Sequence, residues 1–227
     1  GELIGLIGTN GAGKTTAFNV LTGVYEPTDG QIEFDGQSVV GLKPYQITQR
    51  GIARTFQNIR LFADLTVLDN VKIAYHFHVK YGLFESVFRI GRYYVEEDEI
   101  EQKALDFLKV FQLEHRKDEI GKNLRYGEQR RWEIARALAA QPKLLLLDEP
   151  AAGMNPQETQ QLMAMIRWIR KNFNLTILLI EHDMSLVMGV CERIYVLDYG
   201  SIIAHGTPTE IKNNPRVIEA YLGEEVH

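Results

Sequence analysis

Short apolar runs recur along the chain at the length of strands rather than of long helices. Segments between several of them place apolar residues at helical spacing, and Thr15–Leu21 and Glu158–Lys171 are predicted helices. Strands that alternate with helices usually form a mainly parallel sheet, so the pattern predicts an α/β fold. The predicted strands are Leu3–Ile7, Gln31–Phe34, Ile52–Phe56, Leu144–Leu147, Leu175–Ile180, Ile194–Asp198 and Ile202–His205.

The pattern changes between residues 66 and 140, where helical spacing dominates. Val71 follows Val67 and Leu68 by four and three positions, and Leu108 follows Ala104 and Leu105 by the same spacing. Apolar residues spaced in this way lie on one face of a helix. We therefore predict a helical subdomain over residues 66–140. Residues 1–65 and 141–227 are predicted to form the α/β core around it.

Composition narrows the class of protein. The chain has 227 residues and a net charge of −5, which argues against a dedicated nucleic-acid binder, since such proteins usually carry a basic stripe. Its single cysteine, Cys191, excludes an intrachain disulfide. No apolar run in the sequence approaches the roughly 20 residues that a membrane-spanning helix needs.

A glycine-rich segment follows the first predicted strand and opens the first predicted helix. Glycines let a loop curl until several backbone N–H groups face one anion, and the helix N-terminus adds its positive end. Lys14 places a charge on the β- and γ-phosphates of ATP, and the Thr15 hydroxyl ligates Mg²⁺. The predicted nucleotide-binding residues are Gly8, Thr9, Asn10, Gly11, Ala12, Gly13, Lys14, Thr15 and Thr16, with Lys14 also counted as catalytic.

An acidic pair follows the apolar run Leu144–Leu147. A buried parallel strand ends at the edge of the sheet where ligands of α/β folds bind. Asp148 is therefore predicted to hold Mg²⁺, through water. Glu149 is predicted to orient or deprotonate the attacking water.

The segment Leu124-Arg125-Tyr126-Gly127-Glu128-Gln129, with the basic helix after it, resembles the signature motif of ATP-binding cassette (ABC) proteins. The resemblance covers essentially the whole chain. It implies a P-loop NTPase core with a small antiparallel β part, and a Gly127 that faces the ATP of a partner subunit. It also implies that Gln57 contacts the metal and the water, that Ala151–Pro156 is the D-loop, and that His182 is the switch histidine on the γ-phosphate.

Four segments are similar to the ATPase subunits of branched-chain amino acid importers. They are Arg54–Phe62, Tyr81–Phe88, Asp148–Pro156 and the ending from Asn214 to Gly223. This resemblance implies a second ATPase subunit, identical or related, together with integral membrane permeases and an extracytoplasmic amino-acid-binding protein. It also implies a place on the cytoplasmic face of the cell membrane and no nucleic-acid partner. The ATPase of lipopolysaccharide export shares a related ending, so that alternative stays open.

The chain departs from the family pattern at three places. Arg125 stands where many cassettes carry a Ser, and Asn155 replaces the usual D-loop Asp. The family's adenine-stacking aromatic residue has no counterpart here, so we expect residues ahead of Gly1 in the natural protein.

Two alternative functions stay open for the chain: a soluble ATPase acting on DNA or ribosomes, and a regulatory nucleotide-binding module with little hydrolysis. The single cassette without sustained heptads disfavours the first, and Glu149 and His182 weigh against the second.

Overall fold

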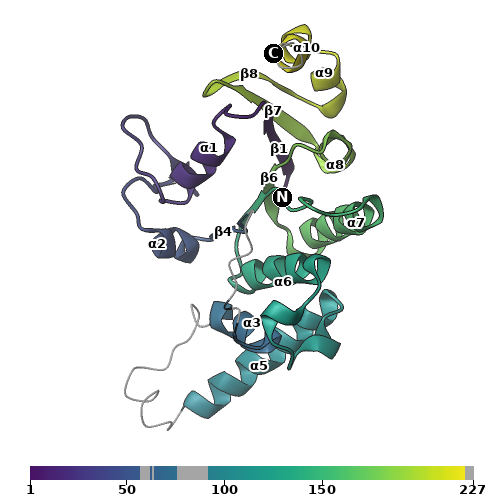
Figure 1. The fold of residues 1–227 in the computed structure, drawn as a ribbon. Helices are drawn as coiled ribbons and strands as arrows, with labels where there is room; N and C mark the ends of the chain where they lie inside the picture. Colours follow the sequence, from purple (N-terminus) through teal and green to yellow (C-terminus); the bar gives the residue numbers. More distant parts are fainter. Residues whose placement is uncertain (57–61, 63, 76–91, 223–227) are drawn as a thin grey trace. The chain divides into compact units, whose positions relative to one another are not determined.

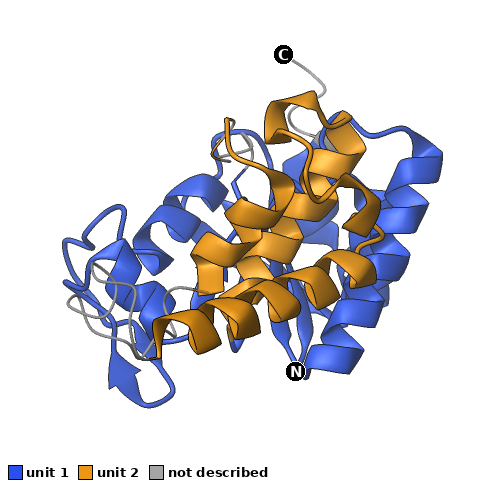
Figure 2. Cartoon of the chain, turned by 90° about the horizontal axis from the view of Figure 1, so that it is seen from below, with its two compact units in different colours: residues 1–57, 143–227 blue, residues 58–142 orange. Residues whose placement is uncertain are grey.

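The computed structural model describes residues 1–56, 62, 64–75 and 92–222. The chain forms two compact units (Figure 2), one made of residues 1–57 and 143–227 and the other of residues 58–142. Each unit is described by itself below.

The first unit is built on a sheet whose strands are ordered β4-β5-β6-β1-β7-β8 (Figure 1). The β7–β8 pair is antiparallel, and the other neighbours are parallel. The predicted α/β class with a mainly parallel sheet is therefore confirmed. The strands are β1 Leu3–Gly8, β4 Ile52–Arg54, β5 Leu144–Asp148, β6 Thr176–Ile180, β7 Arg193–Asp198 and β8 Ser201–Gly206.

Strand β1 lies in the interior of this sheet, between β6 and β7. Its residues read as an apolar run because helices cover both faces of the sheet. On one face (Figure 1), Phe18 of α1 (Lys14–Leu21) packs in a buried cluster with Leu6 and Leu146. On the other face lie α7 (Pro156–Phe173) and α8 (Met184–Val190).

Cys191, just after α8, belongs to the buried core of this unit. A Cβ atom at Gly5 of β1 would lie only 3.0 Å from its sulfur, so strand and thiol are in close contact. Burial raises the pKa of the Cys191 thiol to about 12, and the nearby charge of Glu192 adds to the shift. A thiol held protonated in this way is a packing group rather than a nucleophile.

A small antiparallel hairpin, β2 (Glu33–Phe34) with β3 (Gln37–Ser38), accompanies the sheet. Its turn places Asp35 at φ 50° and Gly36 at φ 72°, and two successive left-handed residues make the turn that suits a two-residue hairpin. The predicted strand Gln31–Phe34 is thus shorter than expected, and β3 was not predicted. Helix α2 (Pro44–Gln49) follows the hairpin.

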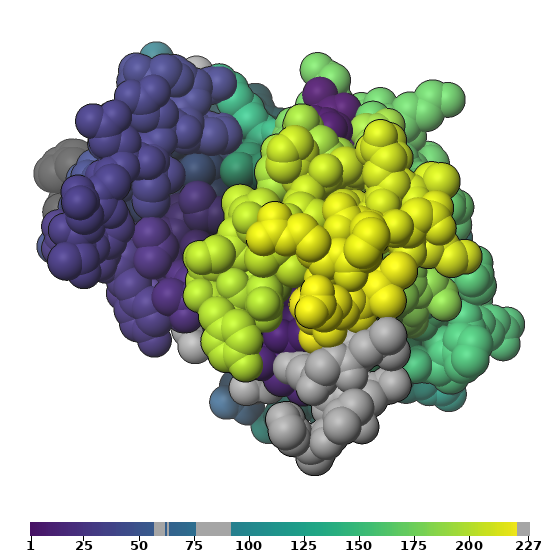
Figure 3. Space-filling view, turned by 90° about the horizontal axis from the view of Figure 1, so that it is seen from above, coloured from purple at the N-terminus to yellow at the C-terminus, as the bar shows by residue number. Residues whose placement is uncertain are grey.

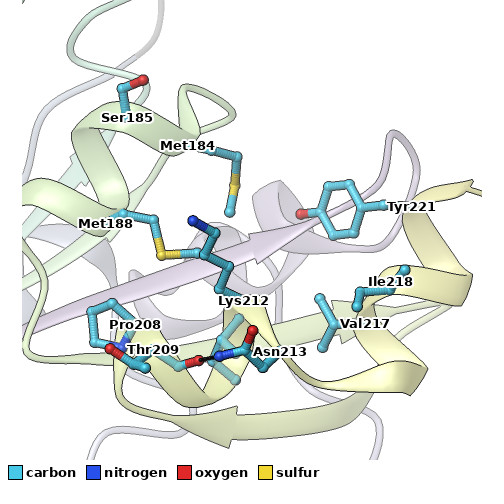
Figure 4. Close-up of a pocket in the computed structure, with 11 residues that line it drawn as sticks. Met184, Ser185, Met188, Pro208, Thr209, Lys212, Asn213, Val217, Ile218 and Tyr221 are labelled. Atoms are coloured by element: carbon cyan, nitrogen blue, oxygen red, sulfur yellow. Dashed lines mark hydrogen bonds between the residues drawn. The ribbon is translucent and has the colours of Figure 1, made fainter.

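The chain continues after β8 into two short helices, α9 (Pro208–Lys212) and α10 (Pro215–Leu222), which contact β8. In Figure 3 these residues, in yellow, form one patch beside the yellow-green residues that precede them in the sequence. Together with α8 they line a pocket of about 800 Å³ (Figure 4). Its lining is largely apolar, with Met184, Met188, Ile211 and Val217 among its residues.

The second unit is helical: α3 (Val67–Tyr75), α5 (Tyr93–Val110) and α6 (Tyr126–Ala139) contact one another. Short 3₁₀ turns at Glu114–Arg116 and Gly121–Asn123 connect α5 to α6. Trp132 of α6 is fully buried, and its Nε1 donates to the Val67 carbonyl at 3.1 Å, which joins α6 to the start of α3. Across the residues that the structure describes, no helix combines the length and the apolar character needed to cross a membrane.

Candidate functional site

The glycine-rich loop leaves β1 at Gly8 and enters α1 at Gly13. A side chain is excluded at Gly8, since a Cβ atom there would lie 2.2 Å from the Leu197 carbonyl oxygen of β7. Gly13 caps the helix at φ 102°, in the left-handed region that favours glycine. The Ala12 carbonyl accepts the Gly200 N–H at 2.8 Å, so the turn between β7 and β8 is hydrogen-bonded to the backbone of the loop.

The first residues of α1 provide a cation and two hydroxyl groups. Lys14 Nζ donates to the carbonyls of Gly8 at 2.7 Å and Thr9 at 2.8 Å, so its charge is held over the loop. Thr15 and Thr16 are exposed in the same turn. A helix N-terminus with a lysine and free N–H groups is suited to bind phosphate.

Asp148 ends β5 beside this helix and is buried. Its Oδ2 accepts a hydrogen bond from Arg54 Nη2 at 2.6 Å, and its N–H donates to Thr55 Oγ1 at 3.4 Å. No residue that the structure describes bonds its Oδ1. Hydroxyl and carboxylate oxygens are hard donors of the kind Mg²⁺ prefers, so Thr15 and Asp148 fit that ion.

A metal held here would depend on the nucleotide as well. Within the described residues, no three His, Cys, Asp or Glu side chains gather closely enough to hold an ion on their own. Mg²⁺ typically takes one or two protein ligands and completes its shell with phosphate oxygens and water. The donor set is thus one that binds metal together with a triphosphate.

Arg54, at the end of β4, is a residue that the sequence analysis assigned no role. Its guanidinium donates to Asn19 Oδ1 on α1 at 2.8 Å and to Oγ1 of Thr22, the C-cap residue of α1, at 3.2 Å, besides Asp148 on β5. The rings of Phe18 and Phe56 lie 5.4 and 4.9 Å from its Cζ. Arg54 therefore ties the glycine-rich helix to the strand that carries the acidic pair.

Glu149 and His182 meet at the same edge of the sheet because β5 and β6 are parallel neighbours. The Glu149 N–H donates to the Ile180 carbonyl at 2.9 Å, and its backbone has φ 46°. A left-handed conformation is uncommon for a residue with a Cβ atom and is found often at functional sites. His182 Nδ1 lies 3.9 Å from Glu149 Oε2, and the His182 side chain is 67% exposed.

Glu181 directly follows β6, next to His182, and its side chain has no exposed surface. Burial raises its pKa, while hydrogen bonds from the amides of Ala151, Asp183 and His182 and the charge of His182 act in the opposite direction. Its place beside His182 in the sequence did not by itself predict a role for it.

Asn155 has a local structural role. Its side chain accepts the Glu158 N–H at 3.0 Å, and Glu158 in turn accepts the Asn155 N–H at 3.0 Å, which is the capping box of α7. The predicted D-loop residue at the place of the family's Asp is thus a helix cap.

We expect Asn155→Ala to lower the free energy of unfolding by about 1 kcal/mol, the usual value of an N-cap side chain. Urea denaturation measures it. Asn155→Asp keeps the acceptor and serves as control, with stability near that of the wild type. An alanine variant as stable as the wild type would show that this cap contributes nothing.

The signature segment opens α6 in the second unit. Arg125 is its N-cap residue, and the Arg125 N–H donates to Glu128 Oε2 at 3.1 Å. Arg116 Nε lies 3.6 Å from the other oxygen of Glu128. Glu128 therefore caps this helix, and Gly127 lies in its first turn.

Several residues singled out in the sequence lie outside the described part of the chain. They are Gln57, Asn58–Leu61, Tyr81–Phe88 and Gly223. The structure brings together the glycine-rich loop, Asp148, Glu149 and His182 in the first unit. Gly127 and Arg125 belong to the second unit.

Comparison with known proteins identifies the family of the chain. Residues 1–152 match the family described as ABC transporter, and residues 201–227 match one described as branched-chain amino acid ATP-binding cassette transporter. The chain is 49% identical over 223 residues to LivG of Escherichia coli, a high-affinity branched-chain amino acid transport ATP-binding protein, covering 98% of this chain and 88% of LivG.

Two further relatives are more distant. LptB of Escherichia coli, a lipopolysaccharide export system ATP-binding protein, is 38% identical over 225 residues, covering 99% of this chain and 87% of LptB. Among solved structures, the ADP conformation of MJ1267, an ATP-binding cassette of an ABC transporter, superimposes with a TM-score of 0.82. It is 30% identical and covers 98% of this chain and 88% of its own.

Proposed function

The chain belongs to the ABC transporter family, and on that premise we propose that it is the ATP-hydrolysing subunit of a branched-chain amino acid importer. One observation carries the proposal: the glycine-rich loop, Asp148, Glu149 and His182 follow the carboxyl ends of the neighbouring parallel strands β1, β5 and β6. That edge is where α/β folds bind their ligands.

The nucleotide binds at the glycine-rich loop. Backbone N–H groups of the loop and of the first turn of α1 bind the phosphates, and Lys14 moves from the loop carbonyls to the β- and γ-phosphates, where its charge stabilises the transition state. Mg²⁺ would be held by Thr15, Asp148 and Gln57. It would supply positive charge that offsets the charge of the phosphates.

Hydrolysis depends on Glu149 and His182. Glu149 accepts a proton from the attacking water or orients that water, and its position at a parallel strand end supports this role. His182 is mostly exposed, so it is free to reach the γ-phosphate. His182 stabilises the charge that develops there.

The complete site needs a second subunit. Gly127 and the N-terminus of α6 face the γ-phosphate held by the partner, so two ATP molecules lie between two subunits. Arg125, at the Ser position of the signature, is close enough to the helix start to add a charge there. Nucleotide binding closes the pair, hydrolysis opens it, and the segment around residues 58–66 passes the motion to membrane permeases.

The cargo is assigned by relatedness. The share of identical residues is higher with LivG than with LptB, and the C-terminal family match points the same way. We therefore propose uptake of leucine, isoleucine and valine, delivered by an extracytoplasmic binding protein. The chain then sits at the cytoplasmic face of the cell membrane as a peripheral subunit.

We expect a strain that lacks this chain to lose high-affinity leucine uptake, and the wild-type gene to restore it. A tagged chain is expected to co-purify with integral membrane proteins after mild detergent extraction. Uptake of radiolabelled leucine and of an unrelated sugar, as control, measures the effect. Unchanged leucine uptake would contradict the cargo, and recovery without membrane partners would contradict the transport role.

A further inference from the structure

Glu181 is a buried carboxylate that the reaction as described leaves without a role. It follows β6 directly, and its side chain has no exposed surface. Burying a carboxylate is strongly unfavourable unless hydrogen bonds satisfy its oxygens. The hydrogen bonds it makes therefore indicate what the residue is for.

Within the part of the chain that the structure describes, its hydrogen-bond donors are backbone amides of two loops. Oε1 accepts the N–H of Ala151 at 2.8 Å, and this bond is buried and joins positions 30 residues apart. Oε2 accepts the N–H of His182 at 3.1 Å and that of Asp183 at 3.3 Å. One carboxylate thus links the turn after Glu149 to the backbone at His182.

A backbone hydrogen bond joins the same two loops beside the Glu181 carboxylate. The Glu149 N–H donates to the Ile180 carbonyl at 2.9 Å, so the start of the same turn is also held to the end of β6. Glu149 itself has φ 46°, a conformation that persists only where the surrounding structure holds it. The bond from Ala151 to Glu181 fixes the turn on the far side of Glu149.

We propose that Glu181 is a positioning residue, which sets the separation between Glu149 and His182 by bonding the backbone of both loops. His182 Nδ1 lies 3.9 Å from Glu149 Oε2 and 3.9 Å from Glu181 Oε2, so a shift of either loop changes this geometry. The inference rests on the proposed function, because Glu181 acts through Glu149 and His182. A displacement of catalytic groups by about 1 Å is enough to slow a reaction severely.

The test uses Glu181→Gln and Glu181→Ala in the assembled transporter. Glutamine keeps the shape but places an NH₂ group against backbone N–H donors, and alanine removes both acceptors. We expect kcat for ATP hydrolysis to fall about tenfold or more in both variants, with a KM for ATP within about twofold of the wild type. Glu210→Gln, which removes a carboxylate that accepts the Thr207 N–H at α9, is the matched control and is expected to keep wild-type kcat.

A second readout does not depend on turnover. In the isolated subunit, the imidazole resonances of His182, assigned from their loss in His182→Ala, are expected to shift in Glu181→Gln, while those of His205 stay in place. If the wild-type transporter did not hydrolyse ATP, the proposed function would be refuted. The His182 shift would still report on the link between the two loops.

Three outcomes overturn the positioning role. The first is a kcat in both variants within about twofold of the wild type. The second is wild-type activity of Glu181→Gln at a temperature where its circular dichroism equals that of the wild type. Such a result would mean that the substitution only lowers stability. The third is an unchanged His182 resonance.

Discussion

Glu149→Gln is expected to lower kcat for ATP hydrolysis by the assembled transporter about 10²–10⁴-fold, the range that a general base contributes. Glutamine has the shape of the glutamate but cannot accept a proton from water. Glu149 has 21% of its side chain exposed, at the end of β5, so it lies at the sheet edge without being freely solvated. The variant is expected to bind ATP as tightly as the wild type, because the phosphate contacts come from the glycine-rich loop.

The measurement is phosphate release under saturating ATP, with nucleotide affinity determined separately by a fluorescent ATP analogue. Glu192→Gln makes the same chemical change at the opposite edge of the sheet, where the Glu192 N–H bonds the Leu3 carbonyl at the start of β1. That control is expected to retain wild-type turnover. Undiminished turnover in Glu149→Gln would remove Glu149 from the role of base.

Buried parallel strands could be predicted because they read as apolar runs, and β1, β5, β6 and β7 lie close to the expected ranges. The ABC family resemblance is confirmed as well. The short helices α2, α8, α9 and α10 were missed, since five to eight residues hold too little of a 3.6-residue period to be distinguished from loop. The equally short α1 could be predicted because it follows the glycine-rich segment. Strand order was also out of reach, because it depends on contacts between distant segments.

The places of the motif residues in the fold could be predicted, since each stands next to a strand end or helix start in the sequence, and their roles stay predictions. The residues that support them could not. Arg54 and Asp148 are 94 positions apart, and Glu181 bonds Ala151 across 30 positions. Arg54 ends the apolar strand β4, and Glu181 follows the apolar strand β6. A charged side chain next to a buried strand must be paired when the chain folds. That signal indicates a partner but does not identify it.

Arg54→Met is expected to lower the free energy of unfolding of the isolated subunit by about 3–5 kcal/mol, because it leaves a buried carboxylate without its partner. The two side chains are each only 6% exposed, and Nη2 lies 2.6 Å from Asp148 Oδ2. The same substitution removes the donor to Asn19 Oδ1 on α1 and to Oγ1 of Thr22, the C-cap residue of α1. Urea denaturation followed by circular dichroism measures the change.

The chain contains a matched control that separates burial from distance. Arg193 and Glu2 form a pair with the same 2.6 Å separation, but their side chains are 43% and 38% exposed. Water already solvates both charges there, so Arg193→Met is expected to cost at most about 1 kcal/mol. A double variant, Arg54→Met with Asp148→Asn, is expected to recover part of the stability that Arg54→Met loses, since no unpaired charge remains buried. If the two single arginine variants were equally destabilised, burial of the Arg54–Asp148 pair would not be the cause, and Arg54 would not hold Asp148 in place for the metal.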